Sequence, residues 1–199
     1  MSNYRIYVEK YPEFQVEARS LLSELNENLQ LDLGTLRLLN VYDLFGFSKD
    51  LLEKSRYSVF GEIVTDSVTD ECDLSGAKYI AVEYLPGQFD QRAASAVDCV
   101  RLIDPSAQVS IKSSKLIILP GETSDETVEK IKKYYINAVE SREKDLAKLN
   151  AMEQPEVAPV PVLEGLTALT AEELAPYCRK MGLAMNADDL REVVNYFKA

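Results

Sequence analysis

An internal repeat constrains the fold of this chain more than any other feature of its sequence. Residues 4–14, YRIYVEKYPEF, align with residues 78–89, KYIAVEYLPGQF. The offset is 74 residues at first and 75 after one inserted residue, and it persists where residues 35–50 align with 110–125. Self-similarity at a nearly constant spacing indicates that one structural unit occurs twice in the chain.

Each copy shows the same succession of patterns. An alternating apolar strand leads to a proline turn, an amphipathic helix, a second strand and a second helix. The second helices are expected to begin at Ser48 and at Thr123, the latter in a capping box with Glu126. The repeat predicts that the last of these helices ends near Asn137 and that a short edge strand follows within residues 138–143.

The sequence therefore predicts an α+β fold with two tandem βαβαβ-like repeats at about 4–68 and 78–143, within a duplicated domain at 1–145. A unit of this size is too small to be robust alone. The two repeats are expected to bury their sheets against one another as a fused pseudo-dimer.

The composition changes after the second repeat. Residues 146–165 are rich in proline and are expected to form a stiff linker. Residues 166–199 are typical of a small helical hairpin. The first helix is expected to start with a capping box of Thr170 and Glu173, and Pro176 is expected to separate or kink its first turn.

The second helix of the hairpin follows the stop signal Gly182 and the capping residue Asn186. A hairpin of this size cannot sustain its own core. Its apolar stripe therefore requires a partner, either the repeat domain or residues beyond Ala199. The candidate interaction residues are those of the stripe, Leu190, Val193, Val194 and Phe197.

Composition excludes several classes of function. The chain has no histidine, so Ser-His and Cys-His catalytic pairs are absent. A formal charge of −11 argues against a nucleic-acid partner. Cys72, Cys99 and Cys178 have no metal-ligand spacing and are interpreted as buried reduced thiols. No long apolar run and no signal peptide are apparent, so no membrane partner and a cytoplasmic location are expected.

The stretch YLPGQFDQRAASAVDCV at residues 84–100 contains the strongest local signals. Asp90 is placed to cap the following helix by accepting from the amide of Ala93. A phosphate at this helix N-terminus, assisted by Gln88 and Arg92, is the alternative. The glycine-rich signature that would make a phosphate site specific is missing.

Four segments together carry a resemblance to a known family. They are RIYVEKYPEFQVEARSLL, EYLPGQFDQRAASAVDCV, YYINAVESRE and LTAEELAPYCRKMGLAMNADDL. Essentially the whole chain resembles the N-terminal part of large single-chain phosphoribosylformylglycinamidine synthase, the formylglycinamide ribonucleotide amidotransferase of purine biosynthesis. Pro176, and Ala138 where a proline is expected, depart from the pattern.

The resemblance implies that the duplicated domain is a fused pair of PurS-type subunits, followed by a helical linker domain. It implies a non-catalytic segment of an ATP- and glutamine-dependent ligase that converts formylglycinamide ribonucleotide to formylglycinamidine ribonucleotide. ATP and Mg²⁺ would serve the parent enzyme, and no catalytic, cofactor or metal residue carries over to this chain. Its partners would be the synthetase and glutaminase domains, and the isolated fragment would be able to self-associate.

Three interpretations of function follow. The first is this non-catalytic segment, which packs domains and couples glutaminase to synthetase. The second is a free-standing regulatory module with a ligand at the seam between its repeats, which requires a polar cleft there. The third is a small enzyme using paired carboxylates, which requires two acids that converge in one pocket.

Overall fold

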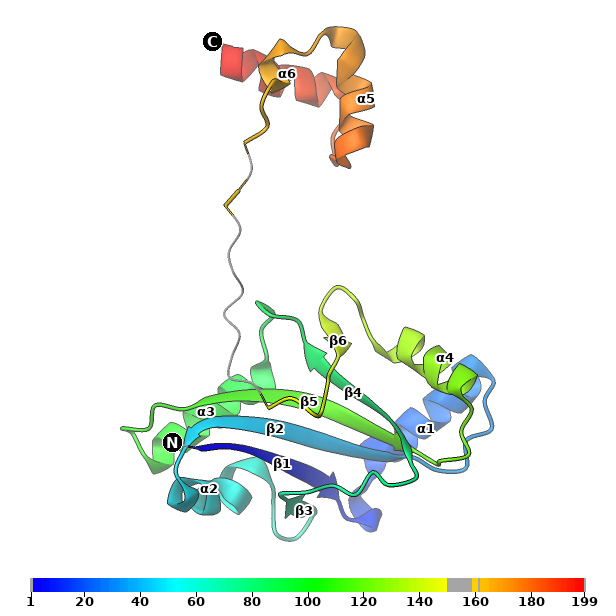
Figure 1. The fold of residues 1–199 in the computed structure, drawn as a ribbon, viewed down its shortest axis with the longest axis vertical. Helices are drawn as coiled ribbons and strands as arrows, with labels where there is room; N and C mark the ends of the chain where they lie inside the picture. The colour runs from blue at the N-terminus through cyan, green and yellow to red at the C-terminus, as the bar shows by residue number, and fades with distance from the viewer. Residues whose placement is uncertain (1, 150–158, 161, 199) are drawn as a thin grey trace. The chain divides into compact units, whose positions relative to one another are not determined.

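The computed structural model describes residues 2–149, 159–160 and 162–198 (Figure 1). Its chain divides into two units, Met1–Pro155 and Glu156–Ala199. Of the expected linker at 146–165, residues 150–158 and 161 lie outside the described residues.

The same order of elements occurs twice in the N-terminal unit. The first run comprises β1 (Ser2–Lys10), η1 (Pro12–Phe14), α1 (Val16–Leu29), β2 (Arg37–Phe47), α2 (Lys49–Ser55), the π-helical turn η2 (Arg56–Phe60) and β3 (Asp66–Thr69). The second run comprises β4 (Lys78–Tyr84), α3 (Gln91–Ile103), β5 (Ser110–Leu119), α4 (Asp125–Tyr135) and β6 (Ser141–Glu143).

The strands form one antiparallel six-stranded sheet in the order β3-β1-β2-β5-β4-β6. The α+β class is thereby confirmed. The expectation that two sheets bury against one another is wrong, because β2 and β5 pair edge to edge and join the two runs in a single sheet. Pairing satisfies the backbone groups that each long strand would otherwise leave exposed at an edge.

The strand registers of the two runs correspond. Ile6 pairs with Tyr42 across β1 and β2, and Ile80 pairs with Ile117 across β4 and β5. The second pair lies 74 and 75 residues after the first, which are the offsets of the sequence repeat. The single inserted residue between strand and helix therefore leaves the ladder in register.

The junction of the two runs is centred on one residue pair. Asn40 of β2 lies opposite Lys115 of β5, and Lys115 follows Asn40 by 75 positions in the sequence. On one side of this pair Arg37 faces Ile118, and on the other Asp43 faces Lys112. The register of the β2–β5 ladder is therefore symmetric about Asn40 and Lys115.

The long helices of the two runs bury equivalent positions on one face of the sheet, behind it in Figure 1. The buried residues of α1 pack with β4, β5 and α4, whereas those of α3 pack with β1, β2 and α2. Each run thus contributes a helix to the core of the other. The two buried sets, which correspond at an offset of 75, are Ala18, Leu21 and Leu25 in α1 and Ala93, Ala96 and Val100 in α3.

Most of the expected boundaries and caps are confirmed. Ser48 caps α2, α4 ends at Tyr135, and β6 is an edge strand within 138–143. The cap of α4 is a correction, because Ser124 and not Thr123 accepts from the backbone amide of Thr127, at 3.1 Å. Either hydroxyl side chain can serve as a cap, so the sequence pattern left a one-residue ambiguity.

The C-terminal unit comprises η3 (Leu166–Ala168), α5 (Ala171–Met181) and α6 (Ala187–Lys198). The capping box before α5, the stop at Gly182 and the Asn186 cap of α6 are confirmed. The expected interruption at Pro176 is wrong, because α5 is continuous through it. Pro176 is exposed, so water can satisfy the carbonyl that loses its amide partner.

One glycine provides a test of the close approach between two loops. A Cβ atom on Gly121 would lie 1.9 Å from the carbonyl oxygen of Gly76. We expect Gly121→Ala to lower the free energy of unfolding by about 1–3 kcal/mol, because backbone must shift. Gly34→Ala is the matched control, since nothing lies within 4 Å of its Cβ, and it should change stability by less than about 0.5 kcal/mol. Urea denaturation checks both, and equal effects would contradict the close contact.

Candidate functional site

A polar cleft of about 210 Å³ lies over the junction of the two runs. Its centre is formed by the opposed residues Asn40 and Lys115 of β2 and β5. Arg92, from the first turn of α3, and Tyr135, from the end of α4, also line it. We call these four residues and the space between them the seam cleft.

Strand alternation places Asn40 and Lys115 on the helix-covered face. Tyr42 and Ile117, each two residues farther along its strand, lie on the same face, and both are buried in the core. A polar residue in such a row is unusual, because burying an amide or an ammonium group is unfavourable unless it is hydrogen-bonded or paired. The two strands therefore interrupt an apolar layer at its centre of symmetry.

Lys115 has one acidic partner at the seam cleft. Its Nζ donates to Oε1 of Glu17 at 2.6 Å, and its side chain is mostly buried. Burial lowers the pKa of Lys115, the ion pair with Glu17 opposes this effect, and the neighbouring Arg92 adds to the lowering. Two cations therefore line the cleft, and one of them is paired with a carboxylate.

Asn40 leaves a hydrogen-bonding group unused. Its Oδ1 atom is buried and has no partner among the described residues. The nearby hydroxyl of Ser113 is committed to Asp90, at 2.8 Å, and that of Ser114 donates to the carbonyl of Val41. The Asn40 side chain thus holds a buried, unused acceptor beside the cleft that Arg92 and Lys115 line.

The N-terminus of α3 is occupied by its own carboxylate. Asp90 accepts from the amide of Ala93 at 2.9 Å, which confirms the expected cap, and also from the amide of Ser113 at 2.8 Å. A carboxylate in this position repels an incoming anion. The amide of Gln88 donates to the carbonyl of Val139, so it does not assist a phosphate site at this helix end.

The face of the sheet opposite the long helices carries a second polar cluster, the buried ion network. Asp43 accepts from Arg5 and, at 2.7 Å, from Lys144, whose side chain is only 4% exposed. Lys144 also contacts Glu83, which pairs with Arg142 at 2.8 Å. Burial lowers the pKa of Arg5, but the ion pair with Asp43 outweighs it and the net shift is upward. Every charge in the network has a partner, so it serves to hold the segment after β6 on the sheet.

The four candidate interaction residues differ in how far the structure buries them. Leu190 and Val194 are buried in a cluster with Leu174 and Cys178 of α5, and Val193 packs against it. The expectation that this stripe lacks a partner within its own hairpin is therefore wrong for these three residues. Of the four, Phe197 is exposed, at 67%.

The three thiols also differ from one another. Cys178 is buried as expected, and Cys72 is half-buried. Cys99 is exposed, which corrects its interpretation as a buried thiol. Successive helix residues are about 100° apart, so Cys99 points away from the face that Val100 buries.

No group of three or more His, Cys, Asp or Glu side chains among the described residues is arranged to hold a metal ion. Within the same part of the chain, no helix combines the length and apolar character needed to cross a bilayer.

The sequence matches no protein-family model and no curated protein. Sequence reasoning missed Asn40 and Lys115. Their signal was present, since polar residues stand at a helix-facing position in both central strands at the repeat offset of 75.

Proposed function

We propose that this chain is the non-catalytic N-terminal segment of a large single-chain phosphoribosylformylglycinamidine synthase. In this proposal the N-terminal unit is a fused pair of PurS-type repeats. The segment packs the synthetase and glutaminase domains against one another and couples their reactions. ATP and Mg²⁺ belong to the synthetase domain of the parent enzyme, and no residue of this chain is assigned to them.

The observation that carries the proposal is the correspondence of the two strand ladders. The registers of β1–β2 and β4–β5 are related by the offsets of the sequence repeat, and the β2–β5 ladder is symmetric about Asn40 and Lys115. This arrangement is that expected of two copies of one small subunit joined in a single chain. It supports the fused-pair interpretation independently of the four resembling segments.

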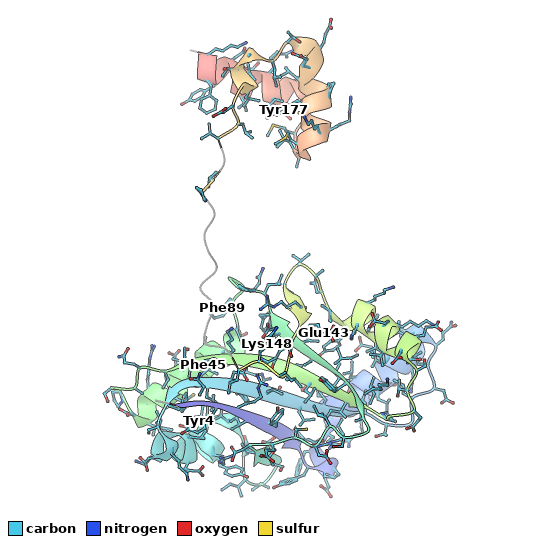
Figure 2. All side chains as sticks on the ribbon, viewed as in Figure 1. Tyr4, Phe45, Phe89, Glu143, Lys148 and Tyr177 are labelled. Carbon is cyan, nitrogen blue, oxygen red and sulfur yellow. The ribbon has the colours of Figure 1, made fainter. Side chains whose placement is uncertain are left out.

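Exposed apolar side chains support a role in packing other domains. Phe89, labelled in Figure 2 on the loop between β4 and α3, is 74% exposed, and Val139 beside β6 is 78% exposed. At the offset of 75, the corresponding residues Phe14 and Val64 are exposed as well. Large exposed apolar groups on a folded unit are typical of contact surfaces. Two equivalent surfaces suit a segment that bridges two partners.

Such a bridge would serve to couple the glutaminase and synthetase reactions. An enzyme that releases ammonia at one site and consumes it at another must keep the path between them closed to water, since ammonia lost to solvent is protonated. Domains held in fixed register by a rigid segment meet this requirement. The proposed role is therefore positional and requires no reacting group in this chain.

A reconstitution experiment tests the proposal. The reading frame is first expected to continue beyond Ala199 into synthetase and glutaminase domains. A synthase truncated to lack residues 1–199 should lose most product formation from formylglycinamide ribonucleotide, ATP and glutamine, and adding the 199-residue chain in trans should restore part of it. The chain alone should turn over none of these substrates. A reading frame that stops at Ala199, or a truncated enzyme with full activity and unchanged coupling, would refute the proposal.

A further inference from the structure

We propose that the seam cleft binds a small dianion that carries a hydroxyl group, of the phosphomonoester or dicarboxylate class. The inference rests on the residues of the cleft and does not depend on the synthase proposal. The ligand would sit over the Asn40–Lys115 pair, at the centre of the two runs.

Two cations of the cleft can receive an anion, Arg92 and Lys115. The salt bridges among the described residues include none to Arg92, whose guanidinium donates only to the hydroxyl of Tyr42, at 3.4 Å. Lys115 has the single partner Glu17. A dianion between these two cations would offset their mutual repulsion and form charge-assisted hydrogen bonds, which are the stronger kind. Arginine in particular suits phosphate and carboxylate groups, because its planar donors match their oxygens.

The amide of Asn40 favours a ligand with a donor beside its charge. A buried acceptor without a partner is unfavourable by about 1–3 kcal/mol. Rotation of the Asn40 amide toward the cleft would let a ligand hydroxyl donate to Oδ1 and would remove this penalty. Inorganic ions without a hydroxyl could satisfy the cations but not this acceptor, so the cleft distinguishes between small anions.

The acidic side chains near the cleft set a limit on affinity. Glu17 competes with the ligand for Lys115, and Glu83 and Glu140 also line the cleft. The Glu17 carboxylate is 64% exposed, so it can turn to solvent when a ligand takes its place. Glu17→Gln is therefore expected to tighten binding, whereas a ligand site unrelated to Lys115 would not respond.

Calorimetric titration of the 199-residue chain with ribose 5-phosphate and with malate tests the proposal. Saturable binding of at least one probe is expected, and the tighter probe assigns the ligand class. Lys115→Met and Arg92→Met should each weaken binding about tenfold or more, as expected for a lost charged hydrogen bond. Lys112→Met is the matched control, since Lys112 lies on the same strand but on the opposite face, and it should leave the affinity unchanged.

Succinate tests the role of the hydroxyl group. It has the two carboxylates of malate without the hydroxyl, so malate should bind more tightly, and Asn40→Leu should abolish the difference. Circular dichroism establishes that each variant is folded. If Lys115→Met does not fold, Arg92→Met alone tests the role of the cleft cations. Absence of saturable binding of both probes at about 10 mM, a concentration that excludes even weak sites, would overturn the proposal. Equal weakening by Lys112→Met and the cleft variants would also overturn it.

Discussion

Replacing Asp43 with alanine is expected to lower the free energy of unfolding of the N-terminal unit by about 3–5 kcal/mol, because it leaves buried charges without a partner. Asp43 is only 3% exposed and accepts hydrogen bonds from both Arg5 and Lys144. Lys144 is itself buried, and Glu83 alone, at 3.3 Å, would then have to compensate it. Urea denaturation followed by circular dichroism measures the change.

Asp125→Ala is the control for this prediction. Asp125 also forms an ion pair, with Lys78 at 2.6 Å, but its side chain is 88% exposed. An exposed pair contributes about 0–1 kcal/mol, so this variant should be nearly as stable as the parent chain. A similar small effect for Asp43→Ala would mean that water replaces the lost carboxylate and that the buried ion network does not hold the segment after β6.

The repeat predicted the strands and long helices well, because burial imposes periodicity on both. Ile6 and Val8 alternate as Ile80 and Val82 do, and all four are buried. A one-residue slip would turn such a row to the opposite face, so the register is strongly specified. The single insertion lies outside the ladders, and the alignment of the two copies therefore extended to the pairing of their strands.

The edge-to-edge junction was not predicted, although the sequence contains a signal for it. Leu38 and Leu39 in β2, and Ile117 and Ile118 in β5, form consecutive apolar pairs. Such runs are typical of strands that are covered on both faces, as central strands of a sheet are. The alternating pattern of β1 instead suits a position farther from the centre.

The seam cleft was not predicted either, and the reason differs from that for the strand junction. Its polar residues come from strands and helices that are distant in sequence, and of the four the sequence singled out Arg92 alone, at the N-terminus of α3. The polar centre of the site depends on the β2–β5 pairing, which brings Asn40 opposite Lys115. Composition showed only that many charged residues exist.

Replacing Val194 with aspartate is expected to unfold the C-terminal unit. Val194 is 3% exposed and packs in a core of four buried side chains with Leu174, Cys178 and Leu190. An unpaired carboxylate in this core should destabilise it by more than about 3 kcal/mol. A core this small rarely supplies more than about 3–5 kcal/mol, so little or no stability would remain. Loss of the α5 and α6 contribution to helical circular dichroism checks this result.

Phe197→Asp separates docking from folding on the same helix. Phe197 is exposed and contacts Tyr196 edge to face, with ring centroids 5.2 Å apart, so its replacement should change stability by less than about 0.5 kcal/mol. In the proposed parent enzyme this variant should raise the ratio of glutamate released to product formed, because the aromatic pair is the exposed part of the α6 stripe that remains for a partner domain. Asn195→Asp introduces the same charge on the other side of α6 and should leave the ratio unchanged. If both variants leave the ratio unchanged while Val194→Asp alone raises it, α6 acts through the fold of its unit and not through a docking surface at Phe197.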